Sequence, residues 1–136
     1  MSPQLRITEG AYFRDILDQP RALAETHRGL DAPPALEDVV RRLRDGDLRR
    51  VVLTGMGSSH LGLVPLHLRL VEAGLAPASV ESSELLYYQR GLLTAGTLLV
   101  LVSQSGRSAE IVRLLEAQEQ ATAELKGKLE EVKNLL

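Results

Sequence analysis

Apolar and polar residues alternate along this 136-residue chain with two periods, one typical of helices and one of short buried strands. Apolar residues recur at helical spacing in four long segments, residues 10–28, 34–46, 58–72 and 108–136. Runs of β-branched and leucine residues interrupt them at three places, residues 49–55, 78–82 and 97–104. The pattern therefore predicts three strands that alternate with helices, and a further short helix or turn at 83–91.

Two prolines and one glycine modify the predicted helices. Pro20 lies inside the first helical segment and is expected to split it into two helices, with Asp18 as the cap of the second. Pro65 is expected either to kink the helix over 58–72 or to lie in its first turns. The terminal segment forms one long helix or two, since Gly127 weakens its second half.

Strands and helices that alternate in this way are typical of a parallel sheet with helices on both faces, so we expect a three-layer α/β fold of the flavodoxin or Rossmann type. Right-handed crossovers place the strands in the spatial order 2-1-3. The third strand is then a long apolar edge that needs cover. We expect the long C-terminal helix or a second copy of the chain to cover it, and a homodimer or higher oligomer to form.

Composition and charge narrow the classes of partner. The net charge is −2 and the aromatic residues are three tyrosines and one phenylalanine, so the chain offers nucleic acid neither a basic field nor a stacking surface. No apolar run approaches the roughly 18 residues of a membrane span, and there is no cysteine. We expect a cytoplasmic, soluble domain with no membrane partner, no metal site and no cofactor.

The basic residues change type near the C-terminus. Every arginine lies at or before residue 113, whereas the lysines lie at 126, 128 and 133. We interpret residues 1–120 as the body of the domain and residues 121–136 as a grafted helical extension, with a chance cluster on a solvated helix as the alternative. One heptad register along this helix indicates either a coiled-coil seam or a helix packed on its own sheet, and it contains Ile111, Leu115, Leu125, Leu129, Val132 and Leu136.

Two of the predicted strands end in loops rich in glycine and serine. The first strand leads into GMGSSHLG, residues 55–62, and the third leads into SQSGRS, residues 103–108. These strands are neighbours in the order 2-1-3, and open parallel sheets bind ligands beyond the carboxyl ends of their strands, where the strand order reverses. We therefore expect the two loops to face each other across one ligand site.

Hydroxyls and backbone N–H groups without a neighbouring lysine suit a phosphate monoester. The candidate binding residues are Gly57, Ser58, Ser59, Ser103, Gln104, Ser105 and Ser108. Plain helix caps are the alternative interpretation of these serines. A dinucleotide site with Glu81 as the ribose-binding acid is a further alternative, although its fingerprint would have a third glycine at His60.

Three of these segments together resemble the SIS (sugar isomerase) domain, a family of aldose–ketose isomerases of sugar and amino-sugar phosphates and of sugar-phosphate-sensing regulators. They are GMGSSHLG, SVESSEL and LVSQSGRSAEIV, and the resemblance covers roughly residues 9–117. It implies that Ser58, Ser59, Ser103, Gln104, Ser105 and Ser108 bind the phosphate of a hexose phosphate or amino-sugar phosphate. Ser108 stands where the family often has threonine. Glu84 matches a position near the family's dimer interface, which implies a structural or supporting role.

The chain also departs from the SIS pattern. A complete SIS domain has five parallel strands, and this chain has candidates for three, with AQEQATAELKGKLEEVKNLL in place of the rest. The family's acid–base residues lie in a second SIS half, and no carboxylate here occupies a matching motif. His60 is the histidine nearest the two loops, and a supporting role for it is expected rather than catalysis.

We therefore expect a sugar-phosphate-binding SIS-type domain that lacks the full catalytic set. The alternatives are an assembly or scaffold protein, natural or engineered, that uses the third strand and the terminal helix; an isomerase assembled from two copies; and a dinucleotide-binding Rossmann fragment.

Overall fold

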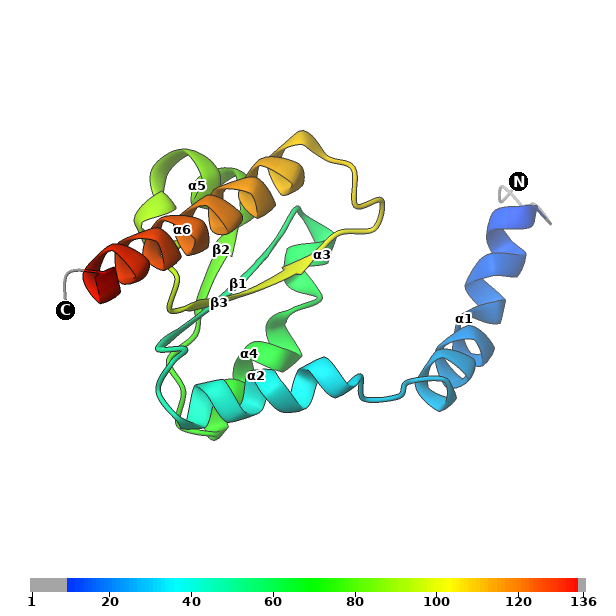
Figure 1. The fold of residues 1–136 in the computed structure, drawn as a ribbon. Helices are drawn as coiled ribbons and strands as arrows, with labels where there is room; N and C mark the ends of the chain where they lie inside the picture. The colour runs from blue at the N-terminus through cyan, green and yellow to red at the C-terminus, as the bar shows by residue number, and fades with distance from the viewer. Residues whose placement is uncertain (1–9, 135–136) are drawn as a thin grey trace, which may run out of the picture. The chain divides into compact units, whose positions relative to one another are not determined.

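The structure is a computed structural model that describes residues 10–134 (Figure 1). The chain divides into two units, residues up to Glu37 and residues from Asp38 onward, and each is considered by itself. The first unit contains helix α1, Ala11–Arg28, and the start of helix α2, Pro34–Arg44. The second contains the sheet and the remaining helices.

Helix α1 continues through Pro20, so the predicted division into two helices is wrong. Proline removes one backbone donor from a helix. Arg21 bridges that turn, since its guanidinium contacts Asp18 at 2.6 Å and Glu25 at 2.8 Å. The hydrogen bond from Arg21 also lowers the pKa of Asp18 below its ordinary value, so Asp18 is an ion-pair partner and not the expected helix cap.

The second unit is built on a parallel three-stranded sheet in the order β2-β1-β3, which confirms the predicted fold. The strands are β1 (Arg50–Gly55), β2 (Ala78–Glu81) and β3 (Thr97–Val102). The helices after them are α3 (Ser58–Leu61), α4 (Val64–Glu72), α5 (Ser82–Tyr88), the single 3₁₀ turn η1 (Arg90–Leu92) and α6 (Ala109–Asn134). The side-chain period of two along β1 sends Val51 and Leu53 to one face and Val52 and Thr54 to the other.

The helix predicted over residues 58–72 is two helices, which meet at Gly62 and Leu63. Pro65 lies in the first turn of α4, where its missing N–H has no helical acceptor in any case. The break leaves α3 with four residues, so the helix dipole expected beneath the first loop is short.

One face of the sheet is covered by α5 and α6 (Figure 1). Its core consists of fully or nearly buried aliphatic residues, namely Val52, Val80, Leu85, Leu86, Leu93 and Leu114. Each such side chain stabilises the fold by about 1.5–3 kcal/mol relative to an exposed one. The hydroxyls of Thr54 and Ser82, both fully buried, satisfy each other at 3.1 Å and join β1 to the start of α5.

The opposite face carries a smaller core of Val51, Leu53 and Leu63, against which Leu43, Leu70, Leu98 and Val100 pack. Strand β3 is one of the two edge strands, with β2 as the other, and most of its side chains are half-buried. Its place at an edge was expected, and cover of that edge by a second copy of the chain stays a prediction. Within residues 10–134 no further strand pairs with it.

Helix α6 packs its first turns on the sheet through Ile111 and Leu114, which are buried, whereas Leu115 is 48% exposed. The heptad register groups Leu115 with Ile111. In the first half of α6 the buried side chains therefore face the sheet and do not match the coiled-coil register. Leu125 is exposed. The other three positions of that register, Leu129, Val132 and Leu136, lie outside the side chains that the structure describes.

Candidate functional site

The two glycine–serine loops start side by side at the carboxyl end of the sheet. Gly55 and Val102, the last residues of β1 and β3, are register partners. A Cβ atom at Gly55 would lie 2.8 Å from the backbone nitrogen of His60 and 3.0 Å from the carbonyl oxygen of Val102. Position 55 therefore has to be glycine, because α3 and the end of β3 approach it too closely for any side chain.

The first loop turns at Gly57, which has φ +51° and ψ −119°, a conformation that residues with a side chain rarely adopt. The N–H of Ser59 donates to the carbonyl oxygen of Met56 at 3.1 Å and closes the turn. Ser58 is exposed and Ser59 is half-buried. Neither hydroxyl makes a hydrogen bond to another residue in the 10–134 range, so both are available to a ligand.

The second loop is shaped by its own serines. The Oγ of Ser103 accepts from the N–H of Gly106 at 3.0 Å, and the Oγ of Ser105 accepts from the N–H of Arg107 at 3.2 Å. Each hydroxyl keeps its proton for a further acceptor, since it acts only as an acceptor inside the loop. A phosphate oxygen is an acceptor of this kind.

Gln104 and Ser108 complete the candidate set on the second loop. Gln104 is exposed, and its amide contacts no described residue through a hydrogen bond. Ser108 directly precedes α6, and its carbonyl oxygen accepts from the N–H of Val112 at 3.2 Å, so it is the cap residue of a long helix. The first N–H groups of such a helix lack internal acceptors and favour an anion.

His60 and Glu84, the two supporting residues, make no hydrogen bond to the serine hydroxyls of the second loop. The Nε2 of His60 is 2.9 Å from the Oγ of Ser79 on β2, so its ring is held at the side of the sheet opposite β3. Glu84 is an exposed residue in the first turn of α5, and its side chain makes no hydrogen bond within residues 10–134. Its expected place near a dimer interface stays a prediction.

Glu81, the last residue of β2, contacts the first loop and was missed as part of this site. Its Oε1 accepts from the N–H of Gly57 at 3.1 Å. The sequence suggested this residue only as the acid of a dinucleotide site. The signal that could have identified the contact is the strand register, because Glu81 is the partner of Gly55 across the β1–β2 ladder.

The described residues contain no group of three or more histidine, aspartate or glutamate side chains with the spacing to hold a metal ion. In the same part of the chain, none of the helices has the length and apolar character to cross a membrane. The site therefore consists of hydroxyls, amides, backbone N–H groups and one carboxylate. The hydroxyls, amides and backbone N–H groups are donors of the kind that an anion accepts from, whereas the carboxylate is an acceptor.

Known proteins resemble the chain in sequence. Glutamine–fructose-6-phosphate aminotransferase (isomerizing) of Pyrococcus horikoshii is 30% identical over 119 residues, which cover 85% of this chain and 19% of that protein. The enzyme of the same name from Aeropyrum pernix is 36% identical over 97 residues, which cover 71% of this chain and 15% of that protein. The chain thus spans less than a fifth of the length of these relatives. No family model matches it.

Solved structures resemble the chain in fold. A putative phosphosugar isomerase involved in capsule formation from Bacteroides fragilis has a TM-score of 0.63 and 22% identity, over 80% of this chain and 58% of that one. Tagatose-6-phosphate ketose/aldose isomerase from Escherichia coli has a TM-score of 0.58 and 24% identity, over 81% of this chain and 31% of that one. Together with the sequence relatives, these structures confirm the resemblance to the SIS domain.

Proposed function

We propose that this chain, which has the fold of the SIS-type phosphosugar isomerases, binds a hexose phosphate or amino-sugar phosphate at the carboxyl end of β1 and β3. The phosphate lies between the two loops and accepts hydrogen bonds from Ser58 and Ser59 on one side. On the other side it accepts from the second loop, whose contributors are Ser103, Gln104, Ser105 and Ser108. The backbone of Gly57 lets the first loop approach it closely.

The observation that carries this proposal is the register of Gly55 with Val102, since it starts both loops at one edge of the sheet. The hydroxyls of Ser58 and Ser59 have no hydrogen bond within the described chain. Those of Ser103 and Ser105 act only as acceptors, so each can still donate its proton to a ligand. The curated relatives are named for fructose 6-phosphate, and one structural neighbour is named for tagatose 6-phosphate. A sugar phosphate is the ligand class common to these names.

Isothermal calorimetry with fructose 6-phosphate and with glucosamine 6-phosphate tests the binding. We expect heat with at least one of them, none with unphosphorylated fructose, and loss of binding in the Ser103→Ala, Ser105→Ala double variant. A matched control replaces Ser83, which lies in α5 and takes no part in the loops. Absence of heat with both sugar phosphates would falsify the proposal.

We further propose that the chain binds the sugar phosphate without interconverting aldose and ketose. That reaction needs a base beside the carbonyl carbon and an acid for ring opening. His60 is engaged by Ser79 on the far side of β1, which supports a structural role. Turnover of fructose 6-phosphate by a dimer of this chain would contradict this and would support an isomerase assembled from two copies.

A second candidate function, self-assembly into a homodimer or higher oligomer, is favoured by apolar surface on the second unit. Val102 at the end of the edge strand is 41% exposed, and Leu68 on α4 is 56% exposed. In the proposed extension, residues 121–136, Leu125 borders a cavity of about 270 Å³ beside Leu93 and Thr94. Contiguous exposed apolar patches mark interaction surfaces, so the proposal requires these side chains to belong to such patches.

Sedimentation velocity at micromolar concentration tests the assembly. We expect a dimer or larger species that dissociates when Leu125 and Val102 are both changed to glutamate, because two charges would then have to be buried. A monomeric wild-type chain would contradict the assembly proposal and leave sugar-phosphate binding as the function. A cytoplasmic location stays a prediction.

A further inference from the structure

The carboxylate of Glu81 holds the first glycine–serine loop from the neighbouring strand. It accepts a hydrogen bond from the N–H of Gly57 at 3.1 Å. A second contact between β2 and the same region joins the Oγ of Ser79 to the Nε2 of His60 at 2.9 Å. Residues 79 and 81 point to the same face along the strand, since side chains alternate with a period of two. Strand β2 therefore fixes the first loop and the start of α3 at two points.

The bond to Glu81 matters because Gly57 is where the loop changes direction. A glycine backbone has many alternative conformations of similar energy. Gly57 adopts one of them, with φ +51° and ψ −119°. A side-chain acceptor for its N–H selects one of them. The N–H of Ser58 and the hydroxyls of Ser58 and Ser59 have no acceptor among residues 10–134. They therefore stay available to donate to a ligand.

The same carboxylate also places a negative charge next to a group of anion-binding donors. Two like charges a few ångströms apart at the surface repel each other, and the repulsion grows with the number of negative charges on the ligand. A phosphate monoester can turn its single phosphate away from Glu81 towards the second loop, whose residue Arg107 carries a positive charge. A ligand with a second phosphate carries more negative charge, so the screened repulsion from Glu81 is larger for it.

We propose that Glu81 is a positioning residue of the first loop and that its charge makes the site selective for a phosphate monoester over a bisphosphate. The proposal rests on the proposed sugar-phosphate function for its second part. The first part concerns only this chain. Glu81→Gln keeps an acceptor oxygen for the N–H of Gly57 and removes the charge, whereas Glu81→Ala removes both, so the two variants separate positioning from charge.

Amide hydrogen exchange tests the positioning without any ligand. We expect the N–H of Gly57 to exchange slowly in the wild type and in Glu81→Gln, and at least about fivefold faster in Glu81→Ala, the factor that corresponds to one ordinary hydrogen bond. The N–H of Gly106, which is held by Ser103, serves as the internal control. Equal exchange of the Gly57 amide in all three proteins would overturn the positioning role.

Calorimetry with fructose 6-phosphate and fructose 1,6-bisphosphate tests the selectivity. In Glu81→Gln we expect the affinity for the bisphosphate to rise relative to that for the monophosphate by about threefold at low salt, and less at high salt. Glu81→Ala should shift this ratio equally but bind both ligands more weakly than Glu81→Gln. A ratio that does not change in either variant overturns the selectivity. If the wild type binds neither ligand, the proposed function and the selectivity fail together, and the exchange data alone decide the positioning role.

Discussion

The loops after β1 and β3 are alike in composition but are held in different ways. The first is fixed from outside, by Glu81 on β2, and its own serine hydroxyls have no hydrogen bond within residues 10–134. The second is fixed from inside, by hydrogen bonds from Gly106 and Arg107 to its own serines. The first leads into the four-residue helix α3 and the second into the 26-residue helix α6.

The difference indicates how stability and binding are related in each loop. In the first loop the serine hydroxyls make no hydrogen bond within residues 10–134, so we expect their removal to leave the stability unchanged. In the second loop the serines shape the backbone as well as offering protons to a ligand, so a substitution there affects both properties. Two loops with the same residue types are therefore expected to respond differently to the same mutation.

Gly55→Ala is expected to have the largest effect, because both loops depend on this position. The new Cβ atom would lie 2.8 Å from one backbone atom and 3.0 Å from another, and backbone atoms cannot rotate away. We expect a loss of about 3 kcal/mol in the free energy of unfolding and loss of sugar-phosphate binding. Urea denaturation followed by circular dichroism measures the first quantity.

Gly62→Ala is the matched control for that substitution. Its Cβ atom would meet the carbonyl oxygens of Ser58 and Ser59 at 3.4 and 3.5 Å, and its φ of −62° suits any residue. We expect a change within about 0.5 kcal/mol. If the two alanine variants were equally stable, the close approach of the two loops at Gly55 would not exist.

The double substitutions Ser103→Ala, Ser105→Ala and Ser58→Ala, Ser59→Ala compare the two loops directly. The first pair removes two hydrogen bonds and should lower the free energy of unfolding by about 2 kcal/mol, near 1 kcal/mol for each bond. The second pair removes none and should change it by less than about 0.5 kcal/mol. Both pairs should weaken sugar-phosphate binding at least tenfold. Equal stability of the two double variants would show that the second loop does not depend on its serines.

Much of this fold follows from local pattern. The β-branched and leucine runs identify the three strands, and chain handedness then leaves the order β2-β1-β3. The candidate serines could be found in the same way, since they lie in the loops that follow β1 and β3. The break between α3 and α4 was harder to predict from the sequence, because Pro65 is compatible with a kink or with a new helix start.

Two features depended on side chains that meet only in the folded chain. Leu114, and not Leu115, faces the sheet, since the direction of α6 is set by its packing against α5 and β3 and not by a heptad repeat. Glu81 reaches Gly57 only when β1 and β2 are in register. Periodicity carries no information on such contacts.

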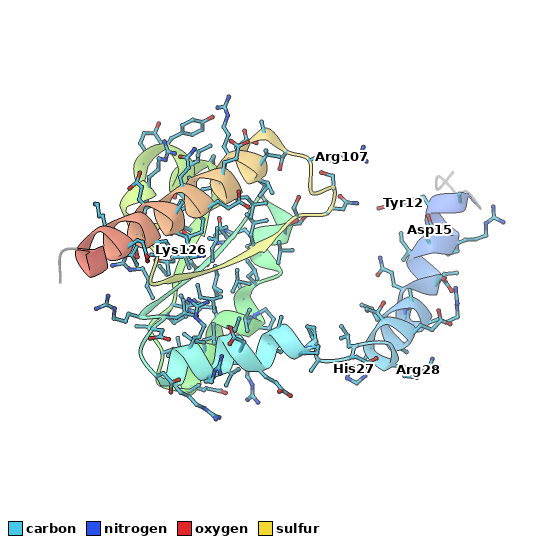
Figure 2. All side chains as sticks on the ribbon, in the orientation of Figure 1. Tyr12, Asp15, His27, Arg28, Arg107 and Lys126 are labelled. Atoms are coloured by element: carbon cyan, nitrogen blue, oxygen red, sulfur yellow. The ribbon has the colours of Figure 1, made fainter. Side chains whose placement is uncertain are left out.

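Arg107→Ala is expected to have the smallest effect, and it tests the difference in charge between the loops. Arg107 extends from the loop between β3 and α6 (Figure 2) and makes no ion pair within residues 10–134, whereas the corresponding charge beside the first loop is the carboxylate of Glu81. An exposed guanidinium near a phosphate contributes a screened attraction. We expect about a twofold loss of affinity for fructose 6-phosphate at low salt, measured by calorimetry, and no difference at high salt.

Arg90→Ala is the matched control. It removes the same charge in η1, which lies at the opposite end of the sheet, where Arg50 donates to the carbonyl oxygens of Gly91 and Leu92. An equal effect of the two substitutions would mean that the net charge of the chain, and not the position of Arg107, attracts the phosphate.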